Sequence, residues 1–262
     1  METRHLNRRQ YFDEQGITSS RHVIPYISKV KPVASHHRIL EIGCGEGGNL
    51  KPFLELGCQA VGVDIKPHQI QNGSAYLKDV ELAERAELIC QNIYDVTADD
   101  LGQFDIVMLR DVIEHIPNQA RFMDHLKQFL KPEGIVFFGF PPWHMPFGGH
   151  QQMCRTRLGK LPYIHLLPRS LYRAYLEMSG ESDDTVESRL EIYDTGITIE
   201  RFSRIAEDAG YRFRDRTLYL VNPNYETKFG LTPRIQYPIL KDIPYLRNLW
   251  TTCCYAILER NP

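Results

Sequence analysis

Short apolar runs alternate with amphipathic segments along the chain from residue 38 to about residue 140. The runs are rich in β-branched residues and are bounded by glycine or polar residues, which is typical of buried strands. Between them, apolar residues recur at helical spacing, and Gly57 and Pro132 mark helix ends. The pattern predicts strands at 38–43, 60–65, 87–90, 104–109 and 134–140, and helices at 48–56, 67–78 and 119–130.

The alternation breaks after Phe140 and resumes near residue 196. Strands that alternate with helices predict βαβ units, and therefore an α/β fold with a doubly wound, Rossmann-like sheet. We expect seven strands, mostly parallel with an antiparallel last strand, and a helical insertion after the fifth strand. The remaining predicted elements are helices at 168–178 and 199–209, strands at 211–221 and 251–258, and a proline-rich excursion between those two strands.

A length of 262 residues suits one large α/β domain with a sizeable core. We divide the chain into an N-terminal helical arm, residues 1–37, and a single domain, residues 38–262. The domain includes an insertion at about 141–195 and an extended hairpin loop at about 222–250. Long segments without strands are usually functional, as lids or binding loops.

The charge balance is close to neutral, with 31 Lys and Arg against 33 Asp and Glu and a net charge of −2. This balance gives no electrostatic reason to bind nucleic acid or an anionic membrane. No apolar run approaches the roughly 18 residues of a transmembrane helix, and the first residues lack the apolar core of a signal peptide. Six cysteines without a framework spacing indicate reduced thiols. We therefore expect a cytoplasmic protein with no nucleic-acid partner. Whether the protein forms a homodimer stays open.

Residues Glu41 to Gly48, with the sequence EIGCGEGG, join the first predicted strand to the first predicted helix. Glycines in such a loop allow a tight turn and a close approach of the backbone to a ligand. Gly43, Gly45 and Gly48 fit the G-x-G-x-x-G spacing, so the loop alone does not identify the cofactor. Asp64 ends the second predicted strand, where its carboxylate can accept both hydroxyls of an adenosine ribose.

Together these residues resemble class I S-adenosylmethionine-dependent methyltransferases. The likeness extends to Asn92, to Leu130-Lys-Pro-Glu-Gly134, and to the segment FDIVMLRDVIEHIP at 104–117. That segment is similar to the "FD-V-----EH-" signature of the ubiquinone- and menaquinone-biosynthesis branch (methyltransferase type 11/12-like). The resemblance covers residues 36–141 closely, and 196–221 and 251–260 more loosely.

The resemblance implies S-adenosylmethionine as cofactor, S-adenosylhomocysteine as product, and a small-molecule acceptor that is methylated on oxygen or nitrogen. Glu41 would orient the glycine loop and the methionine amino group, and Asp64 would hold the ribose. The backbone of Leu109 and Arg110 would meet the methionine ammonium, while Tyr11, in a stretch resembling an N-terminal arm of related enzymes, would help to seal the site. The other implied cofactor-binding residues are Gly43, Cys44, Gly45, Gly47, Ile65, Asn92 and Ile93. Two interpretations of the Arg110 side chain stay open: it pairs with an anionic substrate, or it forms a structural salt bridge.

Three histidines, His115, His144 and His150, are candidate general bases, because an unperturbed imidazole titrates near neutrality. A base is needed only if the acceptor must lose a proton. A structural role is the alternative for each histidine. His144 and His150 lack a zinc-ligand spacing and no Cys-x-x-Cys pair is present, so we predict no metal.

The first part of the insertion, from Pro141 to Leu176, has no acidic residue and interleaves basic with aromatic side chains. One interpretation is a lid over an acceptor with an anionic part and an aromatic or lipid-like part. The equally weighted alternative is that these basic residues pair with the acidic stretch that follows, at 177–194. The basic residues are Arg155, Arg157, Lys160, Arg169 and Arg173.

Other functions fit the sequence less well. An NAD(P)-dependent oxidoreductase uses the same kind of glycine loop, but the one Tyr-x-x-x-Lys match, from Tyr237 to Lys241, is late in the chain and contains Pro238. Methylation of RNA or protein is the second alternative, although no RNA-binding module is recognisable. A non-catalytic scaffold with the same fold is the third, because fold does not imply function.

Overall fold

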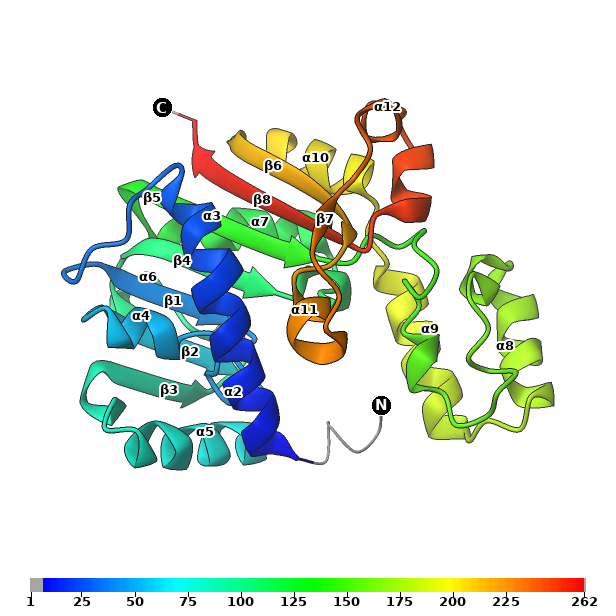
Figure 1. Ribbon diagram of the computed structural model, residues 1–262, viewed down its shortest axis with the longest axis horizontal. Coiled ribbons are helices and arrows are strands. Elements are labelled where there is room, and N and C mark those ends of the chain that lie inside the picture. Colours follow the sequence, from blue (N-terminus) through cyan, green and yellow to red (C-terminus); the bar gives the residue numbers. More distant parts are fainter. Residues whose placement is uncertain (1–6, 262) are drawn as a thin grey trace.

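Eight strands form a single sheet in a computed structural model that describes residues 7–261 (Figure 1). The strand order is β3-β2-β1-β4-β5-β8-β6-β7. Strands β1 to β5 pair in parallel, and β8 runs antiparallel to both of its neighbours. The strands are β1 Arg38–Ile42, β2 Gln59–Asp64, β3 Ala86–Cys90, β4 Phe104–Arg110, β5 Leu130–Phe140, β6 Tyr211–Val221, β7 Arg234–Ile235 and β8 Cys253–Arg260.

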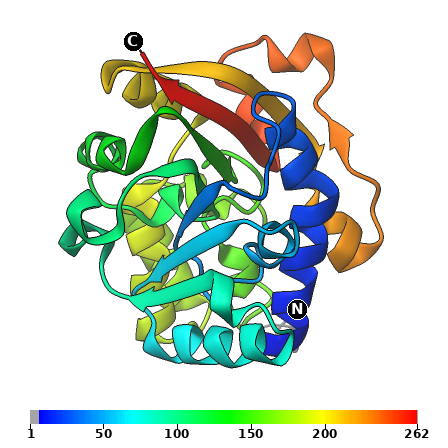
Figure 2. The ribbon, with the colours of Figure 1, turned by 90° about the vertical axis from the view of Figure 1, so that its left-hand side faces the viewer.

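Helices cover both faces of the sheet (Figures 1 and 2). Because successive strand residues point to opposite faces, Ile106 and Met108 of β4 join one core cluster while Val107 and Leu109 join the other. The first cluster packs against α2 to α5 and the second against α7 and α10. The helices are α2 Arg8–Thr18, α3 Ile24–Ser28, α4 Lys51–Glu55, α5 Pro67–Asp79, α6 Ala98–Leu101, α7 Gln119–Leu126, α8 Arg169–Met178, α9 Asp183–Thr195, α10 Ile199–Asp208, α11 Asn224–Phe229 and α12 Pro238–Lys241.

The predicted fold class is confirmed, with differences in detail. The sheet has eight strands instead of seven, because the two-residue β7 in the excursion pairs with β6. Strand β5 begins at Leu130, before the predicted turn at 131–134, and a register shift opposite Phe104 accommodates the extra residues. Helix α9 was not predicted, because its sequence is mostly acidic and polar and contains few apolar residues. Two of these apolar residues, Val186 and Leu190, are buried against α8.

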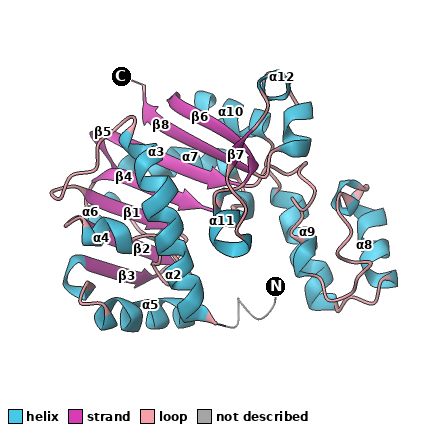
Figure 3. Cartoon of the chain, in the orientation of Figure 1, coloured by secondary structure: helices cyan, strands magenta, loops and turns pink. Residues whose placement is uncertain are grey.

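Two segments far apart in sequence meet over the carboxyl ends of the strands. Helix α2 of the N-terminal arm and α11 of the excursion lie side by side, and His22 Nε2 is 2.7 Å from Glu226 Oε2 across them (Figures 1 and 3). Helices α8 and α9 of the insertion form a separate hairpin. Residues 1–6 lie outside the described residues. They include the start of the predicted arm and the segment for which no signal peptide is predicted. Within residues 7–261 no helix is long and apolar enough to cross a membrane. All six cysteines are unpaired, as expected.

Candidate active site

The glycine loop follows β1 with its glycines in left-handed conformations. Gly43, Gly45 and Gly47 have φ values of +69°, +57° and +76°, which L side chains rarely adopt. A Cβ on Gly43 would lie 2.4 Å from Val112 Cγ2, so the loop touches the turn that follows β4. Gly48 serves another purpose: its missing side chain lets the backbone of α2 approach, with Phe12 O only 2.4 Å from the position of a Cβ.

Glu41 lies fully buried in β1, directly before the loop. Its Oε1 accepts a 2.6 Å hydrogen bond from Asn49 Nδ2, and its Oε2 has no hydrogen-bond partner. Burial raises the pKa of Glu41 to about 8, although the Asn49 hydrogen bond and the Arg110 charge oppose the shift. A buried carboxyl oxygen without a partner is costly unless a ligand satisfies it, which agrees with the predicted role toward a methionine ammonium.

Asp64 ends β2 beside the loop and is half-buried. Its Oδ2 accepts from the Gly45 N–H at 2.8 Å and its Oδ1 from the Lys66 N–H at 2.9 Å, which fixes the carboxylate. Ile65 is 66% exposed, and its apolar side chain can cover a planar ring. Asn92 is exposed at the end of β3, where its side chain accepts from the Tyr94 N–H.

Three of the expected cofactor residues direct their side chains into the protein. Cys44 packs against Gly62 of β2, and Ile93 and Leu109 belong to the hydrophobic core. The Ile93 side chain packs in the apolar core, and its place beside an adenine stays a prediction. Cys44 and Leu109 can face a ligand only through their backbone.

The turn after β4 carries the second group of polar side chains. Asp111 has a φ of +54°, a strained conformation for a residue other than glycine and one that clusters at functional sites. Glu114, in the next short helical turn, is 2% exposed, and neither carboxyl oxygen has a hydrogen-bond partner. Its backbone is held from the insertion, since Thr195 Oγ1 donates to Glu114 O at 2.6 Å.

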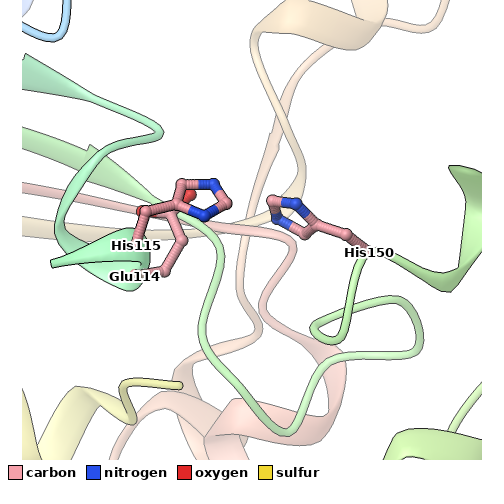
Figure 4. Close-up of side chains that lie close together, drawn as sticks. All are labelled: Glu114, His115 and His150. Atoms are coloured by element: carbon pink, nitrogen blue, oxygen red, sulfur yellow. The ribbon is translucent and has the colours of Figure 1, made fainter. Parts of the chain in front are cut away.

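His115 and His150 face each other at this turn (Figure 4). Their ring centroids are 5.0 Å apart in an edge-to-face arrangement, and His150 is held by a hydrogen bond from Arg189 to its carbonyl. Glu114, His115 and His150 each offer a ligand atom, and the three atoms lie within 4.8 Å of one another, so this group could hold a metal ion. No metal is predicted from the sequence, and no local pattern indicates this group, because only folding brings His150 to His115.

Burial dominates the titration of this group. It raises the pKa of Glu114 well above its usual range, with the Asp111 charge adding to the effect. It lowers the pKa of His150 to about 3, helped by the positive charges of His115 and Arg189. It also lowers the pKa of His115, but here Asp111 opposes the shift. Both imidazoles are therefore neutral near pH 7.

His144 lies elsewhere. It lines an open groove with Trp143, Tyr193 and Tyr245, which does not include His115 or His150. Two of the five basic residues named for the insertion pair with the acidic stretch: Arg169 Nε is 2.8 Å from Asp194 Oδ1, and Arg173 Nη1 is 2.7 Å from Glu187 Oε1. Arg155 and Arg157 are exposed. For α8 and α9 the structure thus supports the pairing interpretation.

Sequence reasoning missed four polar residues of the site: Ser19, Asn49, Asp111 and Asn224. Together with Tyr11 they surround Arg110 at the end of β4. Asn49 could have been noticed, since it follows the glycine loop by one residue, and Asp111 lies inside the recognised signature. Nothing in the local sequence connects Ser19 or Asn224 to this site.

A doubly wound sheet with a glycine loop after β1 and an acidic residue at the end of β2 is typical of Rossmann-like proteins that bind an adenosine-containing cofactor. The methyltransferase domain family matches residues 12–174, more than half of the chain. The chain belongs to this methyltransferase domain family. The predicted cofactor, S-adenosylmethionine, agrees with membership of this family.

Individual comparisons agree with this assignment. The mitochondrial ubiquinone biosynthesis O-methyltransferase of Bos taurus is 28% identical over 144 residues, 49% of this chain and 39% of the relative. The ubiquinone biosynthesis O-methyltransferase of Nitrobacter winogradskyi is 32% identical over 99 residues, 38% and 36% of the two chains. These matches span less than half the length of either relative. A solved geranyl diphosphate methyltransferase in complex with SAM shares the fold, with a TM-score of 0.56 at 13% identity over 91% of this chain and 84% of that one.

The residues of the candidate site fit S-adenosylmethionine. Glu41 offers a buried carboxyl oxygen without a partner, and Asp64 offers a fixed carboxylate at a strand end. Ile65 offers an exposed apolar side chain beside that carboxylate. The left-handed glycines leave the room that side chains would fill.

Proposed function

We propose that this protein transfers the methyl group of S-adenosylmethionine to a hydroxyl oxygen of a small-molecule acceptor. One observation carries the proposal: the glycine loop touches the Asp111–His115 turn through Gly43 and Val112, so the cofactor loop and a pair of neutral imidazoles share one edge of the sheet. The O-methyltransferase relatives support oxygen over nitrogen as the methylated atom.

When bound, S-adenosylmethionine supplies a methyl group on a sulfonium. The chain's own task is to hold the acceptor in line with that group, since positioning supplies most of the rate in such reactions. A hydroxyl acceptor must also lose its proton, and we assign this role to His115. His150 orients His115 by edge-to-face contact, and both rings are neutral and able to accept a proton at pH 7. A phenolic acceptor fits best, because its hydroxyl is acidic enough for a weak imidazole base.

The test begins with calorimetric titration of S-adenosylmethionine and S-adenosylhomocysteine into the native protein and into Asp64→Ala. We expect binding by the native protein and a loss of roughly 100-fold or more in the variant, because two ribose hydrogen bonds to a charged group disappear. Substituted phenols and catechols are then assayed by mass spectrometry for methylated product. Binding of NADH instead of S-adenosylmethionine would overturn the proposal. Cofactor binding without turnover of any acceptor would favour the scaffold.

A further inference from the structure

The guanidinium of Arg110 is a buried cation whose hydrogen-bond partners are all neutral. Arg110 is the last residue of β4, and it is only 8% exposed. Nη1 donates to Asn49 Oδ1 at 2.5 Å and to Ser19 Oγ at 3.2 Å, and Nη2 donates to Asn224 Oδ1 at 2.5 Å. All three acceptors are neutral, and no carboxylate within residues 7–261 forms an ion pair with it. The salt bridge left open by the sequence is therefore not made.

A buried charge that forms no ion pair is costly, and Arg110 lies at the same edge of the sheet as the glycine loop. Two elements far apart in sequence bring the partners together: Ser19 follows α2, and Asn224 begins α11 in the excursion. These contacts leave room beside the guanidinium, because a cavity is lined by Arg110, Asn49, Tyr11 and Asn224 (the arrangement of α2 and α11 is visible in Figure 1).

The cavity contains charges of both signs. Arg110 and Lys228 line it together with the carboxyl groups of Asp111 and Glu14. Asn49 connects Arg110 to Glu41, whose second carboxyl oxygen is unpartnered. A cavity lined by the Arg110 cation at one point and by the carboxyl groups of Asp111 and Glu14 at others is complementary to an α-amino-carboxylate, not to a simple anion.

We infer that the Arg110 guanidinium, held by Asn49 and Asn224, is a carboxylate-binding site that α11 of the excursion completes. The inference rests on the proposed function, since the methionine part of S-adenosylmethionine is the carboxylate that the mixed charges of the cavity favour. An acceptor bearing a carboxylate offers the same chemistry, and the experiment separates the two sources.

The experiment measures binding of S-adenosylmethionine and of its decarboxylated form, which lacks only the carboxylate. Arg110→Met should weaken binding of S-adenosylmethionine by roughly 10- to 100-fold, the effect of losing a charge-assisted hydrogen-bond pair. The same variant should leave binding of the decarboxylated form within about twofold. Arg204→Met, an exposed arginine on α10, is the matched control and should change neither affinity.

The second arm uses protein saturated with S-adenosylhomocysteine and compares 3,4-dihydroxybenzoate with catechol. A loss confined to 3,4-dihydroxybenzoate in Arg110→Met would assign the carboxylate to the acceptor and would also support the site. If Arg110→Met weakens the acidic and the decarboxylated ligands equally, or neither, in both arms, the inference is wrong. A native protein that binds no S-adenosylmethionine would instead overturn the proposed function.

A substitution at Asn224 separates ligand binding from structural support. Asn224→Asp gives Arg110 a nearby carboxylate, which should preserve or raise the melting temperature but compete with the ligand. We expect S-adenosylmethionine to bind at least about tenfold more weakly, with the decarboxylated form unaffected. If Asn224 served only to brace α11, the aspartate would leave both affinities unchanged, and that result would contradict its place in the site.

Discussion

The cofactor edge of the sheet and the two segments beside it hold their charged groups in different ways. At the cofactor edge, residues 41–49, 64–65 and 110–115, the polar groups are buried and partly unsatisfied, as Glu41 and Glu114 show. In the insertion and the excursion, several charged groups form ion pairs, as Arg173 does with Glu187 and Arg247 with Glu200 of α10. Binding capacity therefore lies at the edge, and each segment adds one residue to it: His150 from the insertion and Asn224 from the excursion.

Two glycines with the same backbone angle test this difference most strongly. Gly43 at the cofactor edge and Gly230 in the excursion both have a φ of +69°, but a Cβ would meet Val112 at 2.4 Å in the first and nothing within 4 Å in the second. We expect Gly43→Ala to abolish cofactor binding and lower the free energy of unfolding by about 2–5 kcal/mol, from backbone strain plus overpacking.

Gly230→Ala should cost only about 1–2 kcal/mol, from the backbone alone, and leave cofactor binding intact. Denaturant unfolding and calorimetry on both variants provide the measurement. Adding Val112→Ala to Gly43→Ala should recover the steric part of the loss but not the part due to φ. Equal effects at the two glycines would show that the edge is no more tightly built than the excursion.

Substitution of His115 tests whether the cofactor edge takes part in the methyl-transfer reaction. His115→Ala should lower kcat by roughly 100- to 10,000-fold for a hydroxyl acceptor while cofactor affinity stays within about twofold. His144→Ala, in the separate groove, is the control and should leave kcat unchanged. Inactivation of the native enzyme by EDTA, with recovery on adding back a divalent cation, would mean that Glu114, His115 and His150 hold a metal, and would contradict the role of His115 as base.

The same contrast explains what the sequence could predict. Gly43, Asp64 and Glu114 carry local signals, because each depends on a turn or strand end next to it in the chain. Strand β6 was predicted with both of its ends correct, at 211–221. Two contacts have no local signal in the sequence: His150 with His115, and Asn224 with Arg110. Both contacts depend on how the insertion and the excursion fold back onto the edge of the sheet. The division into arm and domain, and the cytoplasmic location, stay predictions.

Glu41 makes the stability of the cofactor edge depend on pH. Its pKa is about 8 in the folded protein and near its ordinary value of 4.5 when unfolded, so the folded state binds more protons between those values. The free energy of unfolding should therefore fall as the pH rises from 6 to 8, by at most about 1.4 kcal/mol per pH unit from this group. Denaturant unfolding at pH 6, 7 and 8 measures this slope. Glu41→Gln should flatten it, and an unchanged slope in that variant would show that Glu41 is ionised throughout.

The smallest expected effect is at the pairing of α8 with α9. Arg173 contacts Glu187 at 2.7 Å, but both side chains are well exposed, and solvent screens such pairs. Arg173→Ala should lower the melting temperature by less than about 2 °C, and the difference should vanish in 1 M salt. Cofactor affinity and acceptor KM should not change, because the pair holds two helices of the insertion together and does not face the cofactor edge. A rise in acceptor KM with an unchanged melting temperature would restore the lid interpretation and extend the site from the edge into the insertion.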